Sequence, residues 1–208
     1  MLARRPKKVA WVVSRCISNS HREEFVKELQ KYIEVDVFGK CGSLACDVEG
    51  ARPNEETCNS QVMRNYKFYL AFENNFAQDY VTEKFFSRMN DSLVPIVLGQ
   101  ANYSRIAPPH SFINILDYDS PKALADVLHR LDKNATEYLS YLWWKDHYHV
   151  VGDRDVYRLS FCDLCAKLHE DDIPHTYADF GRWWHRDGRL DQKLPQLLAI
   201  IGKQVPTP

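Results

Sequence analysis

The sequence predicts an α/β fold in which a parallel sheet is covered by helices on both faces. Short apolar runs typical of buried strands alternate with amphipathic helical patterns along most of the 208 residues. The first strand, the first helix and the second strand follow one another within about thirty residues, which is the βαβ unit of a parallel sheet. A strongly apolar run at 68–72 ends in polar residues just before another helical pattern. Strands of such sheets end in this way at the edge that binds ligands.

The opening βαβ unit covers residues 8–38. The apolar run at 8–14 predicts a short buried strand. Ser20 and Glu23 have the spacing of a capping box, so a helix is expected to start with Ser20 as its cap. The helix then has one apolar stripe, with residues at i, i+4, i+7 and i+8: Phe25, Leu29, Tyr32 and Ile33. Residues 34–38 predict the second strand, which Gly39 closes.

The third strand is expected at 68–73, after a polar, cysteine-bearing stretch at 41–64 that we interpret as a loop or an excursion. A helix at about 81–90 follows. The next strand is expected at 94–98, and Pro95 favours an edge position or the first residues of that strand.

The second half of the chain is predicted to be mainly helical. A short strand at 113–116 precedes a helix with Ser120 as its cap and Pro121 at its first position. Further helical patterns at about 137–148 and 156–170 follow, and the pattern weakens from residue 171 onward. We therefore expect a Rossmann-like domain over 1–170 and a C-terminal tail over 171–208 that packs on it or extends from it.

The composition is that of a globular protein, with 45% hydrophobic and 26% charged residues. The formal net charge of −1 gives no general attraction to nucleic acid, so no nucleic-acid partner is expected. Any phosphate must be bound by a few placed cations. No stretch is apolar over the length needed to cross a bilayer, and we expect no targeting segment in this sequence.

Cysteines and glycosylation sequons favour an oxidising compartment. The sequence has six cysteines and three sequons, which start at Asn90, Asn102 and Asn134. Six cysteines allow 15 connectivities, and the sequence does not choose among them. For the pair Cys162 and Cys165 we expect a structural disulfide rather than a zinc half-site or a redox pair, because the sequence has no second Cys-x-x-Cys pair and only His169 lies nearby. No metal site is predicted.

A candidate nucleotide site lies at two strand-to-helix junctions. Glu73 and Asn74 end the third strand, and Tyr80, Glu83 and Lys84 lie at the start of the next helix. At the first junction Arg22 takes the matching place. Because the carboxyl ends of parallel strands lie at one edge of the sheet, the two cations could hold a pyrophosphate between them. The alternative is that both are solvated surface charges paired with neighbouring carboxylates, and the surrounding polar residues favour the phosphate site.

The same residues resemble the donor-binding signature of the α1,3-fucosyltransferases. That signature runs Phe-Glu-Asn, a short spacer and Tyr-(Val/Ile)-Thr-Glu-Lys, and it matches residues 72–74 and 80–84. The segments 11–37 and 94–99 and the late Cys-x-x-Cys at 162–165 extend the resemblance over most of residues 9–185. It implies the donor-binding half of a two-domain GT-B glycosyltransferase. The implied reaction is an inverting transfer of fucose from GDP-fucose to O3 of an N-acetylglucosamine.

The resemblance also implies roles for the site residues. Arg22 and Lys84 would hold the donor pyrophosphate, and Asn74, Tyr80 and Glu83 would contact its phosphates, ribose or fucose. Glu73 is the carboxylate proposed for the catalytic set, with a supporting role on the donor side. The acceptor site and the general base are expected in an N-terminal half that this sequence lacks. No divalent metal is expected to be required, because fixed cations can stabilise the leaving diphosphate.

The implied partners are GDP-fucose and the N-glycan of a glycoprotein. The acceptor N-acetylglucosamine could belong to the core of that glycan or to an antenna. The implied location is the Golgi lumen, with a single membrane anchor in a full-length form. Two other functions remain open: a GDP-sugar-binding module that transfers nothing, and a lectin-like domain whose aromatic residues bind glycans directly. The second leaves the arrangement of Arg22 and Lys84 unexplained, so we rank it below the others.

Overall fold

Five parallel strands form one sheet in the order β2-β1-β3-β4-β5. The structure is a computed structural model that describes residues 5–44, 64–89, 91–151, 153–170, 176–181 and 193–203. The strands are β1 (Lys7–Val12), β2 (Val35–Phe38), β3 (Tyr66–Phe72), β4 (Val94–Leu98) and β5 (Ile113–Asn114). Val9 pairs with Val35 on one side and with Phe68 on the other, so β1 lies between β2 and β3, and β3 is the middle strand of the sheet. The predicted parallel sheet is confirmed.

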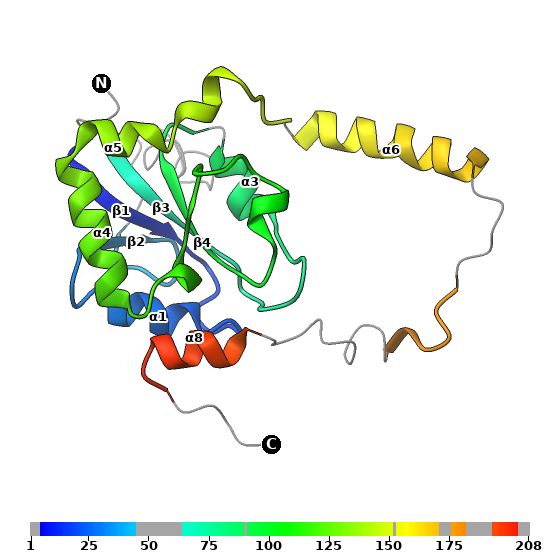
Figure 1. Cartoon of the computed structure of the whole chain (residues 1–208). Helices are drawn as coiled ribbons and strands as arrows, with labels where there is room; N and C mark the ends of the chain where they lie inside the picture. Colours follow the sequence, from blue (N-terminus) through cyan, green and yellow to red (C-terminus); the bar gives the residue numbers. More distant parts are fainter. Residues whose placement is uncertain are drawn as a thin grey trace.

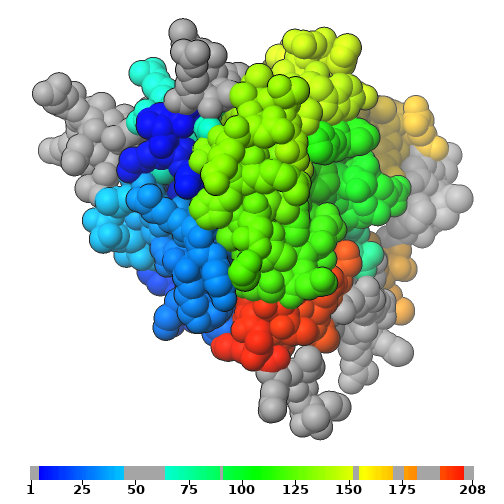
Figure 2. Space-filling view, turned by 60° about the vertical axis from the view of Figure 1, so that its left-hand side comes forward, coloured from blue at the N-terminus to red at the C-terminus, as the bar shows by residue number. Residues whose placement is uncertain are grey.

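Helices cover both faces of the sheet (Figure 1). One face carries α1 (Arg22–Leu29), α4 (Pro121–Lys133) and α8 (Leu194–Ile200), and Figure 2 shows these three side by side. The other face carries α3 (Glu83–Met89) and the 3-10 turn η4 (Trp143–Asp146). The remaining short elements are η2 (Tyr103–Arg105), η3 (Ile115–Asp117) and α5 (Ala135–Ser140).

The two hydrophobic cores follow the alternation of side chains along β3. Phe68, Leu70 and Phe72 point into the core under α1, α4 and α8. Tyr69 and Ala71 point into the smaller core under α3. All seven residues of β3 are buried, as expected for a central strand with both faces covered. The side chain after Phe72 therefore belongs to the α3 side of the sheet.

Residues near the C-terminus contribute to the larger core. Leu197 and Ile200 of α8 lie in the same cluster as the α1 and α4 side chains. Gln196 donates a hydrogen bond to the carbonyl of Leu116 at 2.8 Å. The proposed boundary between a domain at 1–170 and a tail at 171–208 stays a prediction. The pair Trp183-Trp184 lies outside the described residues.

The helix α6 (Asp153–Glu170) extends away from the sheet (Figure 1). Large apolar side chains along it are exposed, including Tyr157, Phe161 and Leu168. Cys162 and Cys165 lie on this helix and are both free and exposed, so the expected disulfide between them is wrong. The reason is geometric: positions i and i+3 of a helix place their Cβ atoms about 5–6 Å apart, whereas a disulfide needs about 4 Å. No helix in the described parts of the chain is both long enough and apolar enough to cross a membrane.

Several boundaries differ from the sequence-based expectation. The cap of α1 is His21, in the left-handed region, and not Ser20. The Ser20 hydroxyl instead donates to the carbonyl of Glu73 at 2.6 Å, so a long-range acceptor replaces the local one. The strand expected at 113–116 ends after two residues and continues as η3, and the helix expected at 137–148 is divided into α5 and η4. The cap at Ser120 is confirmed, since its hydroxyl accepts from the N–H of Ala123.

Candidate functional site

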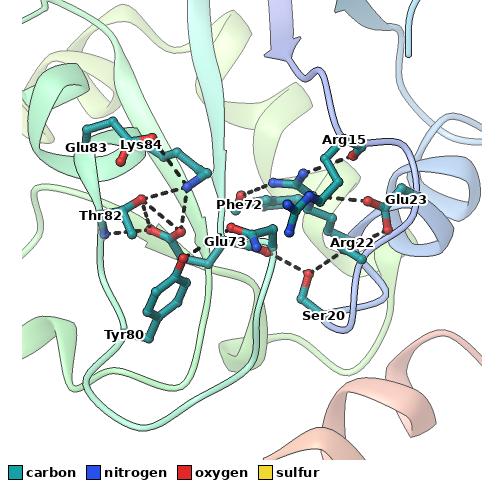
Figure 3. A network of polar contacts seen from close by, with 12 residues as sticks. Arg15, Ser20, Arg22, Glu23, Phe72, Glu73, Tyr80, Thr82, Glu83 and Lys84 are labelled. Carbon is teal, nitrogen blue, oxygen red and sulfur yellow. Dashed lines mark hydrogen bonds and ion pairs between the residues drawn. The ribbon is translucent and has the colours of Figure 1, made fainter. Parts of the chain in front are cut away.

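Glu73 follows β3 directly, and its side chain has no exposed surface. It accepts hydrogen bonds from the backbone N–H of Thr82 at 2.8 Å and from Nζ of Lys84 at 3.0 Å. The Thr82 hydroxyl lies 2.9 Å from both carboxylate oxygens and accepts from Lys84 at 2.7 Å. Figure 3 shows Thr82 and Lys84 converging on Glu73. A buried carboxylate requires such donors, so Glu73 fixes the start of α3 and the ammonium group of Lys84.

Arg22 opens α1 and is only 4% exposed. Its Nη1 donates to the carbonyl of Phe72 at 2.8 Å, and its Nη2 donates to the carbonyl of Arg15 at 3.1 Å. Its Nε lies 3.2 Å from Oε1 of Glu23, and the guanidinium is 5.6 Å from the centre of the Trp11 ring. A guanidinium has five N–H groups, so these contacts leave donors for a further acceptor. Arg22 thereby ties α1 to the end of β3.

Arg22 and Lys84 contact two consecutive residues, Phe72 and Glu73, at the end of β3. Arg22 binds the carbonyl of Phe72, and Lys84 binds the side chain of Glu73. Because α1 and α3 cover opposite faces of the sheet, the two cations approach this point from two sides (Figure 3). Ser20 adds a third contact through its hydrogen bond to the carbonyl of Glu73. The site is therefore centred on the carboxyl end of the middle strand β3.

Of the other residues expected at the site, Asn74 and Tyr80 lie on the loop between β3 and α3, and Glu83 lies at the start of α3. The Tyr80 hydroxyl donates to Oδ1 of Asn74 at 3.3 Å, and both side chains are half-buried. Glu83 is the first residue of α3, and 66% of its side chain is exposed. Partial burial opposes ionisation, but the charge of Lys84 and hydrogen bonds from the Glu83 N–H and Thr82 outweigh it and lower the pKa of Glu83. Glu83 is thus an exposed carboxylate beside the Lys84 ammonium.

This arrangement can bind an anion next to hydroxyl groups. Lys84 is 25% exposed and supplies the accessible positive charge, while Arg22 supplies a second charge from the α1 side. Glu83 and the amide of Asn74 can bind hydroxyl groups close by. Among the described residues, no group of three or more His, Cys, Asp or Glu side chains is placed to hold a metal ion.

The sequence analysis placed neither Ser20 nor Thr82 in the candidate site. Ser20 was expected to cap a helix, and its actual acceptor is 53 residues away. Thr82 lies inside the quoted motif, two residues before Lys84, and its hydroxyl joins the Lys84 ammonium to the Glu73 carboxylate. The sequence did hold a signal for Thr82, because it is a short hydroxyl side chain that lies between the strand-end carboxylate Glu73 and Lys84.

Comparisons with known proteins show which family this chain resembles. A family model for the C-terminal part of glycosyltransferase family 10 (fucosyltransferase) matches residues 2–183. Alpha-(1,3)-fucosyltransferase C of Drosophila melanogaster is 38% identical over 191 residues, which are 90% of this chain and 43% of that protein. Glycoprotein 3-alpha-L-fucosyltransferase A of the same species is 39% identical over 188 residues (88% and 36%). The Homo sapiens 4-galactosyl-N-acetylglucosaminide 3-alpha-L-fucosyltransferase FUT5 is 36% identical over 180 residues (85% and 45%).

A solved structure of an alpha1,3-fucosyltransferase with GDP-fucose has the same fold, with a TM-score of 0.58 and 21% identity. The match covers 85% of this chain and 51% of that chain. The prediction of a Rossmann-like half of a GT-B fold is confirmed. This chain spans less than half the length of the curated relatives named above. From the family match over residues 2–183 and the identity to these relatives, the chain belongs to glycosyltransferase family 10, the fucosyltransferase family, and corresponds to the C-terminal part of its members.

Proposed function

We propose that this chain binds GDP-fucose at the carboxyl end of β3 and forms the donor half of an α1,3-fucosyltransferase. The observation that carries the proposal is the convergence of Arg22 and Lys84 on Phe72 and Glu73 in a chain of this family. Lys84 lies against a buried carboxylate and keeps part of its side chain accessible. A diphosphate at this edge would meet one cation from each side of the sheet.

The proposed chemistry is an inverting transfer of fucose. O3 of an N-acetylglucosamine attacks C1 of fucose, and the bond from C1 to the β-phosphate oxygen breaks with its electron pair on that oxygen. The proton of the attacking hydroxyl goes to a base that we expect in another part of the enzyme. Arg22 and Lys84 stabilise the charge that develops on the diphosphate, so the proposal requires no divalent metal held by the protein.

Glu73 is proposed as a positioning residue for this reaction. Its carboxylate is fully buried and is bound by Thr82 and Lys84, so it reaches the donor only through the Lys84 ammonium. Asn74 and Tyr80, which bind each other, are proposed to contact the fucose or the phosphates. The exposed carboxylate of Glu83 is proposed to accept hydrogen bonds from the ribose hydroxyls.

The proposed acceptor is an N-glycan of a glycoprotein, and the proposed location is the Golgi lumen. The Drosophila relative with 39% identity is named as a glycoprotein 3-alpha-L-fucosyltransferase, which supports this acceptor class. A disulfide between Cys16 and Cys41 supports an oxidising lumen. The sequon residues Asn102 and Asn134 are exposed and could carry glycans there, whereas Asn90 lies outside the described residues. A membrane anchor in a longer form stays part of the proposal.

Titration calorimetry with GDP tests the donor site. Lys84→Ala should weaken GDP binding by at least about tenfold, because a charge-assisted bond to phosphate is lost. Lys31→Ala is the matched control, since it removes another paired lysine, bound to Glu28 on α1. Equal GDP affinity in the wild type and Lys84→Ala would contradict the assignment.

A second assay separates the enzyme from a binding module. The chain is incubated with labelled GDP-fucose and an N-glycan acceptor, alone and after addition of the N-terminal half of a relative. Fucosylated product in either reaction supports the transferase. GDP binding without product in both supports the non-catalytic module, which remains the second candidate because the chain covers less than half of its relatives.

A further inference from the structure

The sequon at Asn102 lies at the same edge of the sheet as the proposed donor site. The backbone N–H of Glu73 donates to the carbonyl of Leu98 at 3.0 Å, so the end of β4 is bonded to the residue that holds Lys84. Asn102 follows shortly after Leu98, directly before η2, and its side chain is exposed and makes no capping hydrogen bond. The amide that would carry an N-glycan is therefore accessible at the carboxyl edge of β4.

Asn102 also lines a cavity of about 650 Å³ at the carboxyl ends of β4 and β5. Gln78 and Asp79, which directly precede Tyr80 on the loop between β3 and α3, line the same cavity. A bulky group on the Asn102 side chain therefore has the cavity and this loop as its immediate surroundings.

The backbone at Asn102 is held in place through its neighbour Tyr103. The Tyr103 side chain is 2% exposed, and the centre of its ring lies 5.3 Å from that of Phe85. Phe85 directly follows Lys84 in α3. The carbonyl of Asn102 accepts a hydrogen bond from the N–H of Arg105 at 3.1 Å. A glycan on Asn102 would thus start from a fixed point beside the first turn of α3.

Gly99 allows Tyr103 to pack this closely against the donor site. A Cβ at Gly99 would lie 2.5 Å from the Tyr103 hydroxyl and 3.7 Å from Cγ of Glu73. Only a residue without a side chain leaves room for the ring there. The middle residue of the sequon therefore packs next to the carboxylate that holds Lys84.

The sequon at Asn134 lies at the other edge of the sheet. Asn134 separates α4 from α5, and its Oδ1 accepts from the N–H of Glu137 at 3.1 Å. Tyr138, on the same helix, donates to the carbonyl of Lys67 at 3.0 Å, and Lys67 is the second residue of β3. Asn134 is therefore near the amino ends of the strands, away from the donor site. A glycan on its Nδ2 leaves the capping oxygen Oδ1 in use.

We propose that an N-glycan on Asn102 blocks the donor site, so that occupancy of this sequon sets the fraction of the protein that binds GDP-fucose. The inference rests on the proposed function and names a modification that regulates the same site. In the attachment, Nδ2 of Asn102 bonds to C1 of the first sugar of a lipid-linked oligosaccharide diphosphate. The bond from that C1 to the diphosphate oxygen breaks with its electron pair on the oxygen, and Nδ2 releases one proton to water.

The burial of Tyr103 determines when the glycan can be added. The enzyme that transfers the oligosaccharide must reach the whole tripeptide Asn-x-Ser, and here the middle residue is packed against Phe85 and begins η2. Attachment therefore has to precede the packing of η2 on α3. Because attachment competes with folding, we expect one preparation to contain chains with and without a glycan on Asn102.

The experiment uses the full 208-residue chain, secreted from a host that attaches N-glycans. The Asn102-only variant, Asn90→Gln/Asn134→Gln, keeps the sequon at Asn102. The matched control is the Asn134-only variant, Asn90→Gln/Asn102→Gln. Lectin chromatography separates the glycosylated and unglycosylated fractions of each, mass spectrometry locates the glycan, and titration calorimetry measures GDP affinity. Adding Ser104→Ala to the Asn102-only variant destroys the sequon and keeps the Asn102 side chain.

The glycosylated fraction of the Asn102-only variant should bind GDP at least about tenfold more weakly than its unglycosylated fraction, because the glycan is bulky and starts beside the site. The Ser104→Ala protein and both fractions of the Asn134-only variant should bind as the unglycosylated fraction does. Equal GDP affinity in the two fractions of the Asn102-only variant overturns the inference. So does mass spectrometry that finds no glycan on Asn102.

A second measurement separates failure of the inference from failure of the proposed function. If no form of the protein binds GDP, the proposed function fails, and oxidative footprinting of Tyr118 and Tyr141 on the cavity wall decides the inference without a nucleotide. Both rings should react more slowly in the glycosylated fraction of the Asn102-only variant than in the unglycosylated one. Equal reactivity shows that the glycan does not cover the cavity and overturns the inference.

Discussion

Lys84 Nζ lies 3.0 Å from Oε2 of Glu73, and the two side chains differ sharply in exposure. The Glu73 side chain is 0% exposed, whereas that of Lys84 is 25% exposed. The ammonium group can therefore regain water if it loses its partner, and the carboxylate cannot. This asymmetry makes Lys84 the member of the pair that is available to a ligand, with Glu73 as its fixed counter-charge.

The asymmetry predicts unequal costs for removing each charge. Lys84→Ala should lower the free energy of unfolding by about 2–3 kcal/mol, because it leaves a buried carboxylate with fewer donors. Glu73→Gln keeps the shape and one acceptor, so its cost should be smaller, about 1 kcal/mol. Urea unfolding of both variants and of the double variant measures these values. An equal loss of unfolding free energy in the two variants, or a larger loss for Glu73→Gln, would contradict the prediction that the buried carboxylate is the costlier charge to leave without its partner.

At the buried position 22, we expect arginine to stabilise the fold much more than lysine would. Its guanidinium binds the carbonyls of Phe72 and Arg15 and the carboxylate of Glu23 at once. A lysine ammonium cannot reproduce this fork, so Arg22→Lys should lower the free energy of unfolding by about 2 kcal/mol.

Urea unfolding checks the Arg22 prediction against a matched substitution. Arg130 is exposed and pairs with the half-buried Glu137, so Arg130→Lys should change the free energy of unfolding by no more than about 0.5 kcal/mol. A cost for Arg22→Lys no larger than that of Arg130→Lys would mean that Arg22 does not anchor α1 to β3.

The disulfide between Cys16 and Cys41 joins the loop after β1 to the segment after β2. It closes a loop with a sequence separation of 25, which corresponds to a stabilisation of about 3 kcal/mol in the unfolded-chain entropy model. A reducing agent should therefore lower the urea midpoint of the wild type and leave that of Cys16→Ser/Cys41→Ser unchanged. The variant Cys162→Ser/Cys165→Ser removes two exposed free thiols and should behave like the wild type. A wild-type midpoint insensitive to reduction would contradict this role.

The sequence was sufficient for features that depend on local pattern. Apolar runs predicted β1 to β4, and the Ser120-Pro121 pair predicted the start of α4. The meeting of Arg22 and Lys84 at one strand end followed from parallel topology alone, because carboxyl ends share one edge. These features require no knowledge of which distant residues touch.

Features that depend on distant contacts could not be predicted in this way. Ser20 has the local pattern of a cap, but a carbonyl acceptor on Glu73 competes for its hydroxyl only once β3 lies beside α1. The closeness of Tyr103 to Glu73 depends likewise on how η2 folds back over Gly99. The apolar pattern of α6 predicted a helix correctly, yet periodicity does not show whether Phe161 is covered, and in the structure it is exposed.

Because of Tyr66, at the start of β3, we expect the free energy of unfolding to depend on pH in the alkaline range. Burial, together with the hydrogen bond that its hydroxyl donates to Asp36, raises the pKa of Tyr66 to about 12, and the Lys7 ammonium opposes the shift. The unfolded chain releases this proton near pH 10. Between these pH values the folded state holds more protons than the unfolded state, so the stability from this group is complete below pH 10 and is lost as pH rises to about 12.

Tyr66→Phe removes this titration and tests its contribution. At pH 8 the variant should be less stable by about 1 kcal/mol, because the hydrogen bond to Asp36 is lost. Toward pH 12 its stability should fall less steeply than that of the wild type, by on the order of 2 kcal/mol over the interval. The difference should therefore shrink and then reverse in urea unfolding series between pH 8 and about pH 12. Parallel curves for the two proteins would show that Tyr66 does not resist ionisation in the folded sheet.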